Sequence, residues 1–143
     1  MTDTFLAQAI FIDTSAVVEI ENSHGPFHED ACRFVESCNE GIVWVSLNAT
    51  THETYTRIRY DLGYDKAIRR YDWLRGSEVT CLSFSKEDEQ EARKQLIKFN
   101  DHKLSFHDAL LAVVMKRVGA YRVFSFDHHF FIFGFEVLPG KTR

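Results

Sequence analysis

The sequence predicts an α/β fold in three layers, with a central, mainly parallel sheet of about five strands and helices on both faces. Short apolar and β-branched runs alternate with longer segments of helical periodicity along the whole chain. Alternation of this kind is typical of parallel strands joined by helical crossovers. The length of 143 residues suits one core. No repeat or linker divides the chain, so we expect a single domain over residues 1–143.

The expected strands are short runs that end at recognisable signals. Residues 9–12 form an apolar run that stops abruptly at Asp13, as a buried central strand does. Pro139, which cannot donate a ladder hydrogen bond, closes the last strand. The remaining strands are expected at residues 42–45, 79–84, 123–126 and 135–138.

Helical segments fill the intervals between the strands. We place helix stops at Gly41, Gly63 and Gly119, because glycine commonly follows the last helical residue. Pro26 is expected near a first turn, where its missing amide hydrogen is tolerated. The final helix is apolar on nearly every side and is therefore expected to be buried. The expected helices cover residues 14–20, 26–39, 51–60, 64–75, 85–99 and 105–118.

Composition excludes several classes of protein. The chain has 17 Lys and Arg against 21 Asp and Glu, a net charge of −4, which argues against a uniformly basic nucleic-acid coat but permits a local basic patch. Three cysteines without a CxxC pair disfavour a disulfide framework or a zinc knuckle. The N-terminal stretch lacks the basic residues of a signal peptide, and the longest pure apolar run, residues 109–115, is too short to span a bilayer. We expect a soluble, cytoplasmic protein without membrane association.

Four acidic residues occupy places where a parallel sheet positions its ligands. Asp13 follows the first expected strand and Asp127 the fourth, whereas Glu53 and Asp108 lie near helix starts. Ligands of open parallel sheets bind at the carboxyl ends of the strands. Because helices begin where those strands stop, we expect the four carboxylates to converge at one edge of the sheet.

The same four residues also have a purely structural interpretation. Asp13 and Asp127 suit N-cap positions. Capping boxes, in which the cap and the third helical residue bond reciprocally, match three segments: Thr50-x-x-Glu53, Ser85-x-x-Asp88 and Ser105-x-x-Asp108. We assign no function to the second of these. Taken singly, each acid is better explained as a cap than as a ligand.

Taken together, the four acids indicate a metal site. Carboxylates within ~5 Å of one another repel by about 3 kcal/mol per pair, so an ionised cluster requires a cation. All-oxygen ligation with open positions for water suits Mg²⁺, with Mn²⁺ as a substitute, rather than zinc. A hard divalent ion activates water and neutralises charge on a phosphoryl oxygen, which predicts phosphodiester hydrolysis.

Four segments, in order along the chain, carry a family resemblance. They are residues 12–16 with Asp13, Thr14 and Ser15, the helix with Glu53, residues 105–110 with Asp108, and residues 124–130 with Ser125 and Asp127. This ordered set resembles the PIN-domain ribonucleases, in particular the VapC-type toxins of bacterial and archaeal toxin–antitoxin pairs.

The resemblance implies an activity, a site and partners. It implies an endoribonuclease in which Asp13, Glu53, Asp108 and Asp127 bind Mg²⁺ or Mn²⁺ and water attacks the phosphorus of RNA. Ser125 and Thr14 are expected to be accessory. A separate antitoxin protein and a homodimer are the implied protein partners.

Residues 57–75 are locally basic, with aromatic side chains between the charges. This stretch suits contact with an RNA backbone, and we include Arg57 as an accessory residue. The alternative is a solvated helical pair, in which Glu53 and Arg57 form a surface ion pair four residues apart.

The histidines do not predict a zinc site. His128 and His129 are adjacent, so we expect their side chains to diverge. His52 and His107 each precede a proposed acid, where contact with substrate and ordinary packing are both open.

Other classes of protein fit less well. Haloacid-dehalogenase phosphatases require Asp-x-Asp after the first strand, and position 15 is Ser. Response-regulator receivers require paired acids and a late Lys that Asp13-Thr14 and Asp127-His128 do not supply. Two alternatives stay open: a non-catalytic PIN-like RNA-binding or scaffold module, and an RNA-processing PIN nuclease that is not a toxin.

Overall fold

A five-stranded sheet, parallel throughout, forms the centre of the computed structural model, which describes residues 4–142. The range leaves out residues 1–3 and 143, the ends of the predicted domain. The sheet order is β3-β2-β1-β4-β5, which confirms the predicted parallel α/β class. The strands are β1 (Ile10–Ile12), β2 (Trp44–Leu47), β3 (Val79–Leu82), β4 (Arg122–Phe124) and β5 (Glu136–Leu138).

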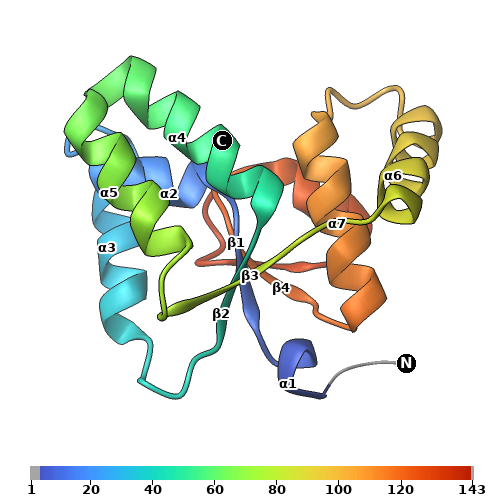
Figure 1. Ribbon diagram of the computed structural model, residues 1–143, viewed down its shortest axis with the longest axis horizontal. Helices are drawn as coiled ribbons and strands as arrows, with labels where there is room; N and C mark the ends of the chain where they lie inside the picture. Colours follow the sequence, from blue (N-terminus) through green and yellow to red (C-terminus); the bar gives the residue numbers. More distant parts are fainter. Residues whose placement is uncertain (1–3, 143) are drawn as a thin grey trace.

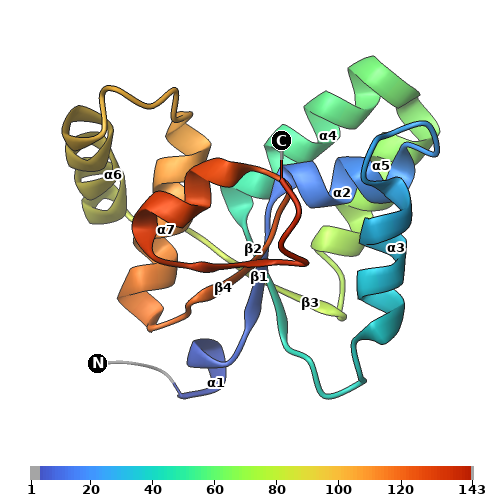
Figure 2. The same cartoon turned by 180° about the vertical axis from the view of Figure 1, so that it is seen from behind.

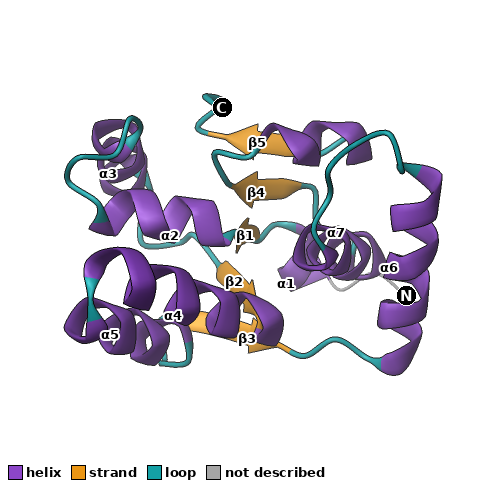
Figure 3. Ribbon diagram, turned by 90° about the horizontal axis from the view of Figure 1, so that it is seen from above, coloured by secondary structure: helices purple, strands orange, loops and turns teal. Residues whose placement is uncertain are grey.

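Helices cover both faces of this sheet, which confirms the predicted three layers. Figures 1 and 3 show α2, α3, α4 and α5 on one side of the sheet and α6 and α7 on the other. Between residues 4 and 142, no helix combines the length and apolar character that crossing a bilayer requires. The helices are α1 (Thr4–Ala7), α2 (Thr14–Glu21), α3 (His28–Ser37), α4 (Asn48–Leu62), α5 (Tyr64–Leu74), α6 (Lys86–Lys98), α7 (Phe106–Val118) and the 3₁₀ helix η1 (His128–Phe133).

Alternating side chains of β1 divide the core between the two faces. Phe11 packs in a cluster with residues of α7, including Leu111 and Met115. Ile10 and Ile12 face the opposite way, in two clusters that include residues of α2. As predicted, α7 is mostly buried, because it covers the centre of the sheet and is itself covered by α6 and η1.

The break between α4 and α5 falls at Gly63, as predicted. Gly63 has φ 105° and ψ 168°, a conformation that side-chain-bearing residues rarely adopt. Its amide donates to the carbonyl of Ile58 at 3.0 Å, which ends α4. The two helices then pack against each other in a hairpin (Figure 1).

Two predicted helices have wrong boundaries. The second predicted helix, α3, begins at His28 and ends at Ser37, so Pro26 precedes the first turn and Gly41 lies beyond the end. Helix α4 begins at Asn48 instead of residue 51, because it follows β2 without an intervening loop. Thr50 is therefore inside the helix, and its expected role in a capping box is wrong.

Three strands also differ from the prediction by two residues at one end or at both ends. β2 lies two residues later than expected, since its pairing with β1 begins at Trp44. β3 and β4 each end two residues earlier than expected, at Leu82 and Phe124. After β4 the backbone turns, and the amide of Phe126 donates to Ser15 Oγ at 2.9 Å instead of extending the strand. Two elements, α1 and η1, were not predicted; Figure 2 shows η1 in the C-terminal part of the chain, drawn in red.

Candidate metal centre

The carboxyl ends of β1 and β4 lie where the strand order reverses, which is where open parallel sheets bind ligands. From β1 the chain builds the sheet outward through β2 to β3, and then returns to place β4 and β5 on the other side of β1. A cavity of about 380 Å³ opens at this point. All four acids predicted from the sequence line it, together with five other residues: Ser15, Arg57, Lys103, Ser105 and His129.

Asp13 is held by hydroxyl groups on two different segments. Its Oδ2 accepts hydrogen bonds from Ser15 Oγ at 2.6 Å and from Ser125 Oγ at 2.8 Å. Ser125 Oγ in turn accepts from the amide of Asp127 at 3.0 Å. Asp13 is only 3% exposed, and this network fixes its carboxylate at the end of β1 while it caps α2.

Asp108 sits in the first turn of α7 in a complete capping box with Ser105. Its Oδ2 accepts from the Ser105 amide at 3.1 Å, and its own amide donates to Ser105 Oγ at 3.0 Å. Burial, and after it the charges of Asp13 and Asp127, raise the pKa of Asp108 to about 7. The carboxylates of Asp13 and Asp127 are therefore close enough to oppose the ionisation of Asp108.

The other two acids reach the cavity in different ways. Asp127 caps η1, and its Oδ1 accepts from the His129 amide at 2.9 Å. Glu53 projects from α4, caps no helix, and places Oε1 3.7 Å from Nδ1 of His107. Glu53 is the most open of the four, with about a third of its side chain exposed.

The capping interpretation and the cluster interpretation both hold for Asp13, Asp108 and Asp127. Each of them caps or lies in a capping box, and each lines the same cavity. The two roles coincide because the segments after the strands begin at the same edge of the sheet. Glu53 lines the cavity but has no capping role.

His107 is a member of the cluster that the sequence left undecided. Nδ1 of this buried ring lies within 4 Å of carboxylate oxygens of Asp13, Glu53 and Asp108. Among the described residues, two groups could hold a metal ion with ligand atoms within 4.8 Å of one another: Asp13, His107 and Asp108, and Asp108, Asp127 and His129. In the sequence, the signal that could have identified His107 is its position directly before Asp108.

Of the two accessory residues next to acids, Ser125 contacts the cluster and Thr14 does not. Thr14 is buried and its hydroxyl accepts from Thr54 at 3.2 Å, which joins α2 to α4. Ser15, which was not among the accessory residues, contacts Asp13 in the way that was expected of Thr14. The amide of the second helical residue commonly donates to an N-cap carboxylate, as the Ser15 amide does to Asp13 Oδ2, and that local rule would have placed Ser15 beside Asp13.

Two cationic side chains line the acidic cavity. Arg57 and Lys103 reach it from α4 and from the loop before α7. The expected ion pair of Arg57 with Glu53 is wrong, because Arg57 pairs with Asp61 at 3.9 Å. The rest of the basic stretch is partly used inside the fold, since Arg70 forms an ion pair with Glu21 on α2.

The other histidines divide between the cavity and the surface. The ring centroids of His128 and His129 lie 4.4 Å apart, so the expectation that the two side chains diverge is wrong. His129 lines the cavity, with Nδ1 3.0 Å from Asp127 Oδ1. His52 stacks on Tyr71, in a different hollow of the surface.

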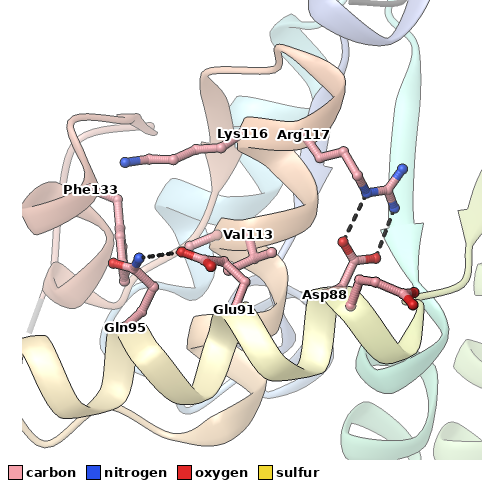
Figure 4. A pocket seen from close by; sticks show the side chains of 9 residues that line it. Asp88, Glu91, Gln95, Val113, Lys116, Arg117 and Phe133 are labelled. Atoms are coloured by element: carbon pink, nitrogen blue, oxygen red, sulfur yellow. Dashed lines mark hydrogen bonds and ion pairs between the residues drawn. The ribbon is translucent and has the colours of Figure 1, made fainter. Parts of the chain in front are cut away.

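A second hollow of about the same volume lies between α6 and α7 and has a different character (Figure 4). There Asp88 accepts two hydrogen bonds from Arg117, at 2.9 and 3.0 Å, and Gln95 donates to Glu91. Its principal buried carboxylate is thus already neutralised by a cation. The cavity where the strand order reverses differs from this hollow, because, among the described residues, its carboxylates are not paired with a cation in this way.

An all-parallel sheet with carboxylates gathered where its strand order reverses defines an α/β protein with an acidic centre. Residues 10–136 match the PIN domain, so the chain belongs to the PIN-domain family, whose fold is that of nucleases. This confirms the family resemblance inferred from the sequence.

Individual relatives point to the same group. The chain is 28% identical over 131 residues to the "23S rRNA-specific endonuclease VapC20" of Mycobacterium tuberculosis, covering 91% of this chain and 98% of that protein. The crystal structure of M. tuberculosis VapC20, described as a toxin that cleaves the sarcin–ricin loop, superposes with a TM-score of 0.83 at 25% identity, over 90% of this chain and 97% of the other. The Neisseria gonorrhoeae FitAcB structure shares the fold, with a TM-score of 0.64 at 17% identity over 92% and 97% of the two chains.

Proposed function

We propose that this chain is a metal-dependent endoribonuclease that hydrolyses RNA phosphodiester bonds, and that it is the toxin of a toxin–antitoxin pair. The convergence of Asp13, Glu53, Asp108 and Asp127 on one cavity is the observation that carries the proposal. Membership of the PIN-domain family supports it.

The donor set of the cavity fits a divalent cation, Mg²⁺ or Mn²⁺. Burial, and after it the charges of Asp13 and Asp127, raise the pKa of Asp108, and a cation would relieve the repulsion among these carboxylates. Asp13, Glu53, Asp108 and Asp127 would hold the ion. When bound there, it would supply Lewis-acid chemistry at a phosphoryl oxygen and make water a better nucleophile.

Side chains of this chain can orient the substrate beside the acids. Arg57 and Lys103 line the cavity and carry the positive charge that phosphate groups of RNA require. Ser15 and Ser125 keep the Asp13 carboxylate in place. In our proposal, the cations bind the phosphates next to the cleaved bond, and the hydroxyl groups position the acid.

The substrate class is inferred from the relative. VapC20 is described as specific for 23S rRNA and as cleaving the sarcin–ricin loop. The chain covers nearly all of that protein, and we therefore propose a structured ribosomal RNA loop as the first substrate to test.

Cleavage of purified 23S rRNA and of a synthetic sarcin–ricin hairpin tests the activity. We expect cutting with Mg²⁺ or Mn²⁺, no cutting with EDTA, and none by Asp13→Asn. Asp72→Asn, which changes an exposed acid on α5, is the matched control and is expected to cut normally. Full activity in EDTA or in Asp13→Asn would contradict the proposal. Binding of RNA without cutting would favour the scaffold alternative.

The toxin role has its own test. Expression of the wild-type chain is expected to arrest growth, co-expression of a protein encoded beside it to restore growth, and Asp108→Asn to be harmless. Arrest by an equally abundant Asp108→Asn variant would exclude nuclease activity as its cause. RNA cleavage without growth arrest would indicate an RNA-processing nuclease instead.

Assembly is a separate part of the proposal. The family resemblance implies an antitoxin partner and a homodimer. Light scattering of the purified chain, alone and with the neighbouring gene product, would measure both, and a strictly monomeric chain would contradict the homodimer.

A further inference from the structure

Two buried ring nitrogens at the acidic centre, Nδ1 of His107 and Nδ1 of His129, have no hydrogen-bond partner among the described residues, and His107 is the less exposed of the two side chains. Nδ1 of His107 is buried and unpaired among the described residues, and the side chain is only about 6% exposed. A buried nitrogen without a partner costs free energy, typically about 1–3 kcal/mol. Its orientation toward three carboxylates therefore requires an explanation.

The distances around Nδ1 are too long for hydrogen bonds. Asp13 Oδ1 and Glu53 Oε1 lie 3.7 Å away, and Asp108 Oδ1 lies 3.9 Å away. Hydrogen bonds to nitrogen end near 3.2 Å. Two atoms can contact one ion, at bond lengths of about 2.0–2.2 Å, when they lie within about 4.0–4.4 Å of each other. Each of the three separations meets that condition.

The carboxylate oxygens that face Nδ1 are the ones the fold does not use. Asp13 gives Oδ2 to Ser15 and Ser125 and turns Oδ1 toward His107. Asp108 gives Oδ2 to the Ser105 amide and likewise turns Oδ1 toward His107. The local structure thus leaves one oxygen of each acid, and one nitrogen, directed at a common centre.

The other ring nitrogen has a partner that can set the tautomer. Nε2 lies 2.7 Å from Thr50 Oγ1, which is fully buried on α4. When Nε2 donates its hydrogen to Thr50, Nδ1 carries a free lone pair. Metal-binding histidines commonly have such an outer partner on the second nitrogen.

We propose that Nδ1 of His107 is a ligand of the metal ion, so that the site is a mixed nitrogen and oxygen centre that selects Mn²⁺ over Mg²⁺. This inference rests on the proposed metal dependence and goes beyond it, because the four acids alone would make an all-oxygen site. Imidazole suits transition ions, whereas Mg²⁺ prefers oxygen ligands and retains its waters. Thr50 is the positioning residue that keeps the ring in its ligating tautomer.

Pulsed EPR of Mn²⁺ bound to the full chain tests the ligand directly. We expect modulation from a coordinated nitrogen in the wild type, and loss of that modulation in His107→Phe, which keeps a ring but has no lone pair. His52→Gln, which changes an exposed histidine outside the cavity, is the matched control and is expected to keep the signal. His129→Gln is also measured, because His129 lines the cavity.

The outcomes separate the inference from the proposed function. Mn²⁺ that binds without nitrogen modulation in the wild type, or with modulation lost only in His129→Gln, would overturn the assignment of His107 and leave the nuclease proposal standing. Failure of the wild type to bind Mn²⁺ at all would overturn both. The wild-type measurement decides the question even if His107→Phe does not fold.

Calorimetric affinities test the selectivity and the role of Thr50. Thr50→Val is expected to weaken Mn²⁺ binding by about 10–100-fold and Mg²⁺ binding much less, because it removes the outer partner of the imidazole. Thr50→Ser keeps the hydroxyl and is expected to restore the preference for Mn²⁺. Equal losses for both ions, or no rescue by serine, would contradict positioning through His107.

Discussion

Asp108 forms part of a helix cap and also lines the acidic cavity. Its Oδ2 completes the capping box of α7, while its Oδ1 faces the acidic centre. The capping bond favours the ionised carboxylate, but burial and the charges of Asp13 and Asp127 outweigh it and raise the pKa to about 7. This residue therefore couples the stability of the fold to the charge of the site.

That coupling predicts a pH dependence of stability in metal-free protein. The pKa of Asp108 is near 3.9 in the unfolded chain and about 7 in the folded one, so the native state holds the proton more tightly. Its contribution to stability is fully present below about pH 4 and is lost as pH rises to about 7. Asp108→Asn is therefore expected to be more stable than the wild type at pH 8, by about 2–4 kcal/mol, and similar at pH 4.

Urea unfolding in EDTA at both pH values measures this difference. Asp72→Asn, an exposed acid, serves as the control and is expected to change stability little at either pH. An Asp108→Asn variant that is less stable than the wild type at pH 8 would refute the proposed repulsion.

Ser125 and Thr14 test which hydroxyl supports the site. Ser125→Ala removes the donor to Asp13 and the acceptor for the Asp127 amide, so we expect cleavage to fall about 10–100-fold. Thr14→Val removes only the acceptor for Thr54, and we expect a loss of stability of about 1–2 kcal/mol with cleavage unchanged. Cleavage rates at saturating metal, with unfolding curves, distinguish the two. Equal cleavage by both variants would contradict the role of Ser125.

At the scale of the elements, α6 and α7 begin with the same local motif but meet different surroundings. Ser85 and Asp88 form a complete capping box at the start of α6, as Ser105 and Asp108 do at the start of α7. Burial works to raise the pKa of Asp88, but hydrogen bonds from Arg117 and Ser85 hold it below its usual value. The Asp88–Arg117 pair thereby fastens α6 to α7 (Figure 4).

Removal of Arg117 is expected to weaken the contact between α6 and α7 and to destabilise the fold. Arg117→Met leaves the buried Asp88 without its cation, and because Arg117 is half exposed we expect a loss of about 1–3 kcal/mol at pH 7. A depressed pKa stabilises the fold above about pH 4, so the difference from wild type should shrink as pH falls below that value. Lys94→Met, which breaks an exposed pair with Glu91, is the control and should cost less than about 0.5 kcal/mol. Thermal unfolding between pH 3 and pH 7 measures the difference in stability between Arg117→Met and the wild type. A difference that does not change with pH would contradict the role of the Asp88–Arg117 pair.

At the scale of the whole molecule, the sheet order explains why the acids meet. Residues from four distant parts of the chain reach one cavity because β1 and β4 are neighbours with their carboxyl ends together. A cation bound there would join α4 and α7 to the ends of these strands and stabilise only the folded state.

Metal binding should therefore raise the thermal midpoint of the chain. With Mn²⁺ at 100 times its dissociation constant, the expected gain is about 2.7 kcal/mol, or roughly 5–10 °C for a chain of this length. Asp13→Asn is expected to show a much smaller shift at the same concentration, and Asp72→Asn the full one. Differential scanning calorimetry with and without EDTA measures the shifts, and identical shifts for all three proteins would place the ion elsewhere.

Much of the fold was predictable because its signals are local. The apolar run before Asp13, the helix break at Gly63 and the buried α7 follow from patterns within a few residues. The start of β2 and of α4 was not predictable, because strand pairing, rather than composition, determines where β2 begins. His107 was missed as a member of the centre for a related reason, because its partners Thr50 and Glu53 lie far away in the chain.

The amino-acid sequence by itself determined the parallel α/β class, the order of the acids and the capping boxes, since these depend on periodicity and on bonds between near neighbours. Only the tertiary structure decided which capped acid belongs to the acidic centre. Asp88 lies against Arg117, and its pKa is lowered, whereas burial and the neighbouring carboxylates raise the pKa of Asp108. Electrostatic environment depends on what the fold brings together, and two identical local motifs can therefore have opposite chemistry.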